Sequence, residues 1–178
     1  MSIYISGIGV SRGIAIGKAF VLAREQHEAT QITLPASEIN NEVKRFKKAL
    51  KLANKQLHEI KEKIAKDTAS DIVAFIDTHL LMLEDPAFDE GTIANIQEFS
   101  CNAEWALHLQ GERLVQVFDE MEDPYLRTRK DDVLHIVKRI HSCLAGKKQT
   151  KDGHLYRGKI IVADDLTPAD TIMMQHEK

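Results

Sequence analysis

A repeating apolar seam over residues 39–64 is the feature that most constrains the fold of this chain. Apolar residues recur there at alternating steps of four and three, which is a period of 3.5 residues. That period is typical of a long helix that packs against other helices in a bundle or coiled coil. Pro35 and Ser37 precede the seam as helix start signals. We therefore expect one long helix whose buried stripe is Ile39, Val43, Phe46, Leu50, Ala53, Leu57, Ile60 and Ile64.

A second helix is expected from about Ser70 to Glu84, and the dipeptide Asp85-Pro86 should interrupt it. Proline disfavours the helical conformation of the residue before it, whereas it suits the first turn of a new helix. Asp85 should therefore cap a short helix over about 86–97. The second helix presents an apolar side made of Ile72, Phe75, Ile76, His79, Leu80 and Leu83.

Two more helices are expected before residue 146. Ser100 or Asn102 should cap one that runs to about Met121. Asp123-Pro124 repeats the pairing of cap and proline and should open the other, which ends near 144 with Gly146 as its stop. The seam expected for this last helix is Leu126, Val133, Val137, Ile140 and Leu144.

The two ends of the chain differ in character from its middle. Residues 3–22 are rich in Ile, Val and Gly, and residues 159–163 form an apolar run, so both favour strands. Thr167-Pro168 then resembles a helix start. We predict an α+β fold in which an antiparallel four-helix bundle over 35–146 is inserted into an incomplete α/β domain built from 1–30 and 147–178, because short connections favour antiparallel neighbours.

Charge is strongly segregated along the chain, although the net charge is only −3. Residues 67–123, here called the acidic segment, carry fourteen acidic side chains and one basic one, Arg113. Residues 35–66 carry nine Lys and Arg against four Glu, and residues 124–151 carry eight against two acids. Two interpretations stay open: an acidic surface that attracts a basic partner, or acids that pair with the neighbouring basic helices.

Several classes of protein are excluded by composition and motif. No apolar run is long enough to cross a bilayer, and the first residues lack the features of a signal peptide. Cys101 and Cys143 have no metal or disulfide spacing, so we expect reduced thiols in the cytoplasm. The acidic segment repels phosphate backbones, which argues against nucleic-acid binding. No phosphate-binding loop or catalytic motif is present, and Asp132-x-x-His135 alone is too little for a two-metal bundle, so we expect no metal site.

His79 lies in the acidic segment beside Leu81 and Met82, which extend the apolar surface past the expected core. One interpretation is a half-buried histidine with a local hydrogen bond. The other is an exposed apolar patch rimmed by acids, which is typical of a docking surface.

Four stretches together resemble a known family. The first is Gly7 to Ala19 (GIGVSRGIAIGKA), and the second is His79 to Pro86 (HLLMLEDP). The third is Tyr125 to Arg129 (YLRTR), together with Asp132-Val133 and Lys138-Arg139. The fourth is Ala163 to Thr171 (ADDLTPADT). In this order and spacing they resemble the N-terminal portion of enzyme I of the bacterial phosphoenolpyruvate:sugar phosphotransferase system. Arg12 stands where the family more usually has proline. The resemblance covers essentially the whole chain.

The resemblance implies a division of labour. Members of the family take phosphate from phosphoenolpyruvate onto a histidine and pass it to the small phosphocarrier HPr. The inserted helical domain docks HPr, and the swivelling α/β domain carries the phosphohistidine. A C-terminal barrel binds phosphoenolpyruvate and Mg²⁺ and forms the homodimer.

The phosphorylated histidine of the family lies in a Gly-Gly-x-Thr-x-His segment, and the chain ends at Lys178 before any such segment. His176 is near the expected place but lacks the glycines and the threonine. We therefore expect a monomeric fragment that docks HPr without transferring phosphate and that needs no cofactor itself.

The family's docking surface falls on nine residues of this sequence, here called the docking set. Apolar members should fill the centre of the contact and acids should face the basic rim of HPr, so association should be sensitive to salt. Pro86 and Ala87 stand where some relatives carry further acids, which changes individual salt bridges. The docking set is Phe75, His79, Leu81, Met82, Asp85, Phe88, Phe118, Met121 and Arg129.

Two alternatives remain. A nitrogen-regulatory paralogue of enzyme I would dock its own HPr-like carrier; such relatives usually carry an extra sensory domain, and none precedes residue 1. The other alternative is a purely structural helical bundle whose acids pair with its basic helices.

Overall fold

The computed structural model describes residues 4–22, 29–64, 70–146, 157–164 and 166–175. The fold is mostly helical with a small parallel sheet, which agrees with the expected α+β class. In chain order the elements are β1 (Lys18–Leu22), α1 (Ala36–Glu62), α2 (Ser70–Leu83), α3 (Pro86–Phe99), α4 (Ala103–Asp119), α5 (Pro124–Arg127), α6 (Arg129–Leu144), β2 (Lys159–Ala163) and α7 (Pro168–Gln175).

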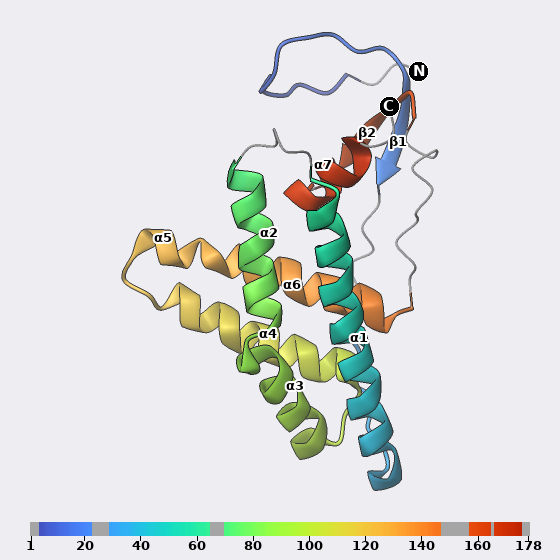
Figure 1. The fold of residues 1–178 in the computed structure, drawn as a ribbon, viewed down its shortest axis with the longest axis vertical. Coiled ribbons are helices and arrows are strands. Elements are labelled where there is room, and N and C mark those ends of the chain that lie inside the picture. The colour runs from blue at the N-terminus through green and yellow to red at the C-terminus, as the bar shows by residue number, and fades with distance from the viewer. Residues whose placement is uncertain (1–3, 23–28, 65–69, 147–156, 165, 176–178) are drawn as a thin grey trace.

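The long helices form two pairs. Helices α1 and α2 lie side by side, and α4 and α6 lie side by side and cross them (Figure 1). Gly111 allows α4 to approach α6 closely, since a Cβ atom at this position would lie 2.8 Å from a methyl group of Val137. None of the described helices combines the length and apolar character that a membrane span requires.

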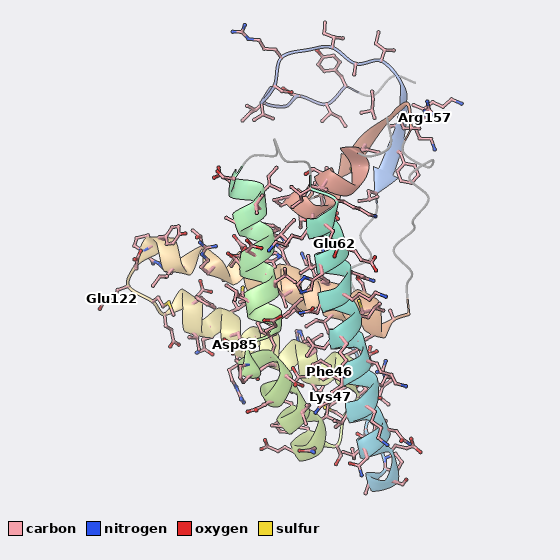
Figure 2. The ribbon with its side chains drawn as sticks, viewed as in Figure 1. Phe46, Lys47, Glu62, Asp85, Glu122 and Arg157 are labelled. Atoms are coloured by element: carbon pink, nitrogen blue, oxygen red, sulfur yellow. The ribbon has the colours of Figure 1, made fainter. Side chains whose placement is uncertain are left out.

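The seam expected over residues 39–64 is confirmed. All eight of its positions are buried or half-buried. Phe46, Ala53 and Leu57 are fully buried (Phe46 is labelled in Figure 2). Ile64 lies just beyond the last residue of α1 and still packs against the core. The 3.5-residue period therefore identified the stripe by which α1 contacts the other helices.

Both expected pairings of aspartate cap and proline are confirmed. The Asp85 carboxylate accepts a hydrogen bond of 2.8 Å from the backbone N–H of Ala87. The Asp123 carboxylate accepts one of the same length from the N–H of Tyr125. Each bond satisfies a donor that the first turn of the new helix would otherwise leave free. Gly146 follows α6 with φ +65°, a conformation that favours glycine.

The last long helix differs from the expectation. Residues 124–144 form α5 and α6, separated at Thr128, rather than one continuous helix. The Thr128 hydroxyl donates a hydrogen bond of 2.6 Å to the backbone carbonyl of Tyr125, so its side chain competes for a carbonyl of this turn. Leu126, expected in the buried seam, lies in α5 and is 40% exposed.

The start of α4 also differs from the expectation. Asn102 occupies the cap position, but its side chain makes no capping hydrogen bond. Its Oδ1 instead accepts 2.9 Å from the N–H of Ile32, in the segment before α1. The Glu42 carboxylate of α1 accepts 2.6 Å from the N–H of Ala103 and takes the place of the cap. A residue sixty-one positions away thus replaces the local cap.

Segments from the two ends of the chain meet in the sheet. Strand β1 pairs with β2 in parallel, from Lys18 opposite Lys159 to Leu22 opposite Ala163. Helix α7 follows β2 and contacts α1 and α2 at the end where α1 stops and α2 begins (Figure 1).

The start of α7 is the one that Thr167-Pro168 predicts. The Asp170 carboxylate accepts from the Thr167 N–H at 2.9 Å, and the Thr167 Oγ1 accepts from the Asp170 N–H at 3.2 Å. These reciprocal bonds form a capping box. Ala169 and Ile172 of α7 are buried in the helical core.

Candidate docking surface

The docking set is distributed over four helices and two turns. Helix α2 carries Phe75, His79, Leu81 and Met82, and α3 carries Phe88. Asp85 lies between α2 and α3 (Figure 2). Helix α4 carries Phe118, Met121 follows it, and Arg129 begins α6.

Members of the docking set differ widely in exposure. Leu81 is 70% exposed, and Asp85 is also exposed. Phe88 and His79 are only 3% and 2% exposed, so they support the surface from beneath rather than offering contact area. Met82 is half-buried and packs against the core, so Leu81 extends the apolar surface more than Met82 does.

A polar and aromatic cluster joins α2 to α6. The His79 Nε2 lies 3.3 Å from the Asp132 Oδ1, and the Arg129 Nη1 donates to the Asp132 Oδ2 at 2.9 Å. Arg129 also donates to the Tyr125 hydroxyl, and its guanidinium carbon lies 4.9 Å from the centre of that ring. The Phe75 ring lies 4.0 Å from the His79 ring, centre to centre. We call Phe75, His79, Tyr125, Arg129, Asp132 and His135 the α2–α6 cluster.

The hydrogen bonds of this cluster hold Asp132 in its charged form. Burial alone would raise the pKa of the Asp132 carboxyl, but hydrogen bonds with His79 and Arg129 outweigh it, so this pKa lies below its ordinary value. The hydrogen bond with Asp132 in turn raises the pKa of Arg129. Arg129 is thus fixed in place at the start of α6, with its guanidinium still part-exposed.

The sequence patterns did not single out Asp132 and Tyr125 as parts of this site. Their spacing to Arg129, three residues for Asp132 and four for Tyr125, is the helical spacing at which side chains meet, so a signal was present. Tyr125 is 62% exposed, and it adds to the exposed apolar area of Val117 and Leu126 near the ends of α4 and α5. Val117, Tyr125 and Leu126 are thus exposed apolar side chains that lie close in sequence to the last members of the docking set.

The acids of the acidic segment divide between the two interpretations. Asp77 pairs with Lys61 at 2.7 Å, and Asp119 pairs with Lys130 at 2.8 Å, so some acids do pair with the basic flanks. Others are exposed at the turns that border the docking set, including the turn after α4 where Figure 2 labels Glu122. These exposed acids are Glu84, Asp85, Glu120, Glu122 and Asp123.

A second arginine cluster, here called the α1–α4 network, lies between α1 and α4. The Arg45 guanidinium binds the Glu104 carboxylate through two hydrogen bonds of 2.9 and 2.6 Å. It also binds the Glu42 carboxylate, which caps α4. Burial raises the pKa of Glu104, but Arg45 outweighs it, so this pKa lies below its ordinary value. The hydrogen bonds with both glutamates raise the pKa of Arg45.

Comparisons with known proteins agree with this combination of a mostly helical part and a small parallel sheet. Residues 6–129 match the family described as PEP-utilising enzyme, N-terminal. The chain belongs to this family.

Two relatives with the same name illustrate the likeness. The chain is 35% identical over 185 residues to the phosphoenolpyruvate-protein phosphotransferase of Cupriavidus necator, covering 99% of this chain and 32% of that protein. It is 34% identical to the protein of the same name from Bacillus subtilis, covering 97% and 30% respectively. The chain therefore spans about a third of the length of these relatives.

Two solved structures share the fold. One, described as the NMR solution structure of Enzyme I (nEIt) protein, matches with a TM-score of 0.77 and 31% identity, over 92% of this chain and 66% of that one. The other, described as the N-terminal domain of Enzyme 1 - Nitrogen, matches with a TM-score of 0.69 over 90% of this chain and 65% of that one. Its identity is 21%, so this second likeness concerns the fold alone.

Proposed function

We propose that this chain is the N-terminal part of a cytoplasmic phosphoenolpyruvate-protein phosphotransferase and that its helices dock an HPr-type phosphocarrier. In this proposal residues 35–146, which include α1 to α6, are the inserted docking domain, and residues 1–30 and 147–178 contribute to the α/β domain that carries the phosphohistidine. Family membership and the names of the relatives support this proposal.

The observation that carries the docking proposal is the exposure of Leu81. An apolar side chain that is 70% exposed on α2, close in sequence to the exposed acids Glu84 and Asp85, fits a partner with an apolar centre and a basic rim. Arg129, fixed by Asp132 and Tyr125, adds an oriented hydrogen-bond donor. Its planar guanidinium suits a carboxylate or a phosphate.

Docking and chemistry reside in different parts of the proposed enzyme. Phosphate passes from phosphoenolpyruvate to a histidine and then to the histidine of the carrier. No histidine among residues 1–178 has the Gly-Gly-x-Thr-x-His context. We therefore assign the docking step, and not the phosphate transfer, to this part of the enzyme. We also propose that Mg²⁺ binding and dimerisation belong to other parts of the whole enzyme.

The alternative function is that of a nitrogen-regulatory paralogue, whose N-terminal domain shares this fold. In that case the same surface would prefer the HPr-like carrier of the nitrogen branch. Parallel titrations with the two carriers separate the branches, because the cognate carrier should bind at least about tenfold more tightly. Equal affinity for both would contradict the assignment to either branch.

A calorimetric titration of HPr into the 178-residue chain at low and high ionic strength tests the docking proposal. Binding should be measurable at low salt and weaken as salt screens the acidic rim. Leu81→Asp should lower the affinity by at least about tenfold, because it places a charge at the apolar centre. Leu52→Asp is the matched control: Leu52 is 43% exposed on α1, outside the docking set, and should leave the affinity unchanged.

Circular dichroism of both variants verifies that the helices persist. An absence of binding at low salt to either carrier would overturn the docking proposal and favour the purely structural bundle. Equal losses of carrier affinity in Leu81→Asp and Leu52→Asp would show that Leu81 of α2 is not at the centre of the docking surface.

A further inference from the structure

Three potential metal ligands of the α2–α6 cluster converge where α2 meets α6. Among the residues that the structure describes, His79, Asp132 and His135 each offer one ligand atom, and these atoms all lie within 4.8 Å of one another. His79 and Asp132 are buried, and His135 is half-buried. Asp132 and His135 are three residues apart on α6, so they share one face of that helix, and His79 comes from α2.

The chemistry and spacing of these atoms suit zinc. Two imidazoles and one carboxylate are a common ligand set for Zn²⁺, with bond lengths of about 2.0–2.2 Å. Two ligand atoms of a tetrahedral ion with such bonds lie about 3.3 Å apart. The observed separation between the His79 Nε2 and the Asp132 Oδ1 is 3.3 Å. His135 completes the set, since the ligand atom that it offers lies within 4.8 Å of those of the other two residues.

The surroundings prepare the carboxylate for a metal. Arg129 holds the Asp132 Oδ2, so the Oδ1 is the oxygen that faces His79. Partners of this kind orient a ligand in metal sites. The Phe75 ring lies 4.0 Å from the His79 ring and 6.2 Å from the His135 ring, which gives the site an apolar side. The positive charge of Arg129 opposes a cation, so we expect moderate rather than tight affinity.

We propose that His79, Asp132 and His135 bind a Zn²⁺ ion that links α2 to α6, with a water molecule as the fourth ligand. The ion takes the place between the His79 Nε2 and the Asp132 Oδ1, so the Nε2 must be unprotonated and the imidazole proton resides on Nδ1. His79 and Arg129 also belong to the docking set, but the test of this site does not rest on the docking proposal, because metal binding is measured on the chain alone.

The expected consequence is greater thermal stability. An ion that binds the folded state only stabilises it, and at about a hundredfold excess over Kd the melting temperature should rise by roughly 5–10 °C. Co²⁺, which accepts the same ligands and absorbs visible light when tetrahedrally bound, should give a coloured complex with one equivalent at this site.

The experiment compares melting curves and Co²⁺ absorption spectra of the unmodified chain with those of two variants. His135→Gln keeps a polar side chain of similar size and should abolish both the absorption band and the rise in melting temperature. His108→Ala is the matched control: it removes another helical histidine that lies near a carboxylate, Glu112 at 3.4 Å, but outside the proposed ligand set. This variant should keep both signals.

His135→Ala serves as a second removal, and circular dichroism without metal shows whether each variant is folded. Retention of the band and of the temperature shift in both folded His135 variants would overturn the site. Their absence from the unmodified chain would overturn it equally. Loss in His135→Gln together with retention in His108→Ala supports it.

Discussion

The α1–α4 network and the α2–α6 cluster each contain an arginine that pairs with a carboxylate, but the other partners of the two arginines differ. Arg45 binds two carboxylates, and one of them also caps α4. Arg129 binds one carboxylate and the exposed Tyr125, and its guanidinium carbon lies 4.9 Å from the centre of that ring. Pairing with two carboxylates, one of which also caps a helix, holds two helices together. Pairing with one carboxylate and a tyrosine leaves polar atoms available to a partner or an ion.

The largest difference between the two regions should appear on removing Arg45. Arg45→Ala leaves Glu42 and Glu104 without their shared cation, and the free energy of unfolding should fall by about 2 kcal/mol. Arg45 is 40% exposed, so we expect less than for a fully buried pair. Urea denaturation measures the change. Lys55→Ala is the control, since Lys55 is 73% exposed and 3.9 Å from Glu59, and it should show no measurable change. A similar loss in both variants would remove the special role of Arg45.

The stability that Glu104 contributes to the α1–α4 network should depend on pH. The pKa of Glu104 in the folded chain lies below its ordinary value of 4.5. Its contribution to stability is therefore complete above about pH 4.5 and is lost as pH falls through the lower pKa of the folded state. Urea midpoints measured from about pH 6 to pH 3 should fall less steeply in Glu104→Gln than in the unmodified chain. Parallel curves would mean that Glu104 does not carry this dependence.

Arg129 should matter less for stability and more for binding. Arg129→Gln removes one charged hydrogen bond and the contact with Tyr125, which should cost about 1 kcal/mol. If the docking proposal holds, the same variant should weaken carrier binding about tenfold, whereas Arg45→Ala should leave the affinity of the folded fraction unchanged. Calorimetry and urea denaturation of both variants provide the comparison. Equal effects of the two variants on both measurements would erase the distinction between the regions.

The smallest effect is expected for a surface pair near the second region, whose side chains are 41% and 47% exposed. Lys130 pairs with Asp119 at 2.8 Å, between α6 and the end of α4. Solvent and salt screen such a pair, so Lys130→Ala should not change the urea midpoint measurably at physiological ionic strength. A clear loss of stability would show that the exposed pair, and not only Arg129, fastens the start of α6.

The features that the sequence predicted well are those that depend on neighbouring residues. The seam of α1, the caps by Asp85 and Asp123 and the start of α7 at Thr167 all follow from local spacing or backbone conformation. Each rule relates residues no more than four positions apart, and tertiary packing did not override it.

Most features that the sequence did not predict depend on distant partners. The break at Thr128 is the exception, because its hydroxyl donates to the carbonyl of Tyr125 three residues earlier. Glu42 replaces Asn102 as the cap of α4, and Asp132 meets His79 from another helix. His79 was expected on the apolar side of its helix, with a half-buried histidine as one interpretation, and it is buried. The burial of Phe88 depends on how the helices cross, which periodicity does not specify. Of the docking set, the exposure of Leu81 agrees with the expected patch, whereas carrier binding awaits the titration.

The cap that Glu42 provides has a consequence for how this chain opens. An ordinary cap breaks when the first turn of its helix frays, so the amide beside it exchanges with solvent often. The Ala103 amide is held by a side chain of α1, and it can exchange only when the two helices separate. In hydrogen–deuterium exchange, the first amide of α4 should therefore be protected far longer than a helix terminus usually is, and it should report the separation of α1 from α4.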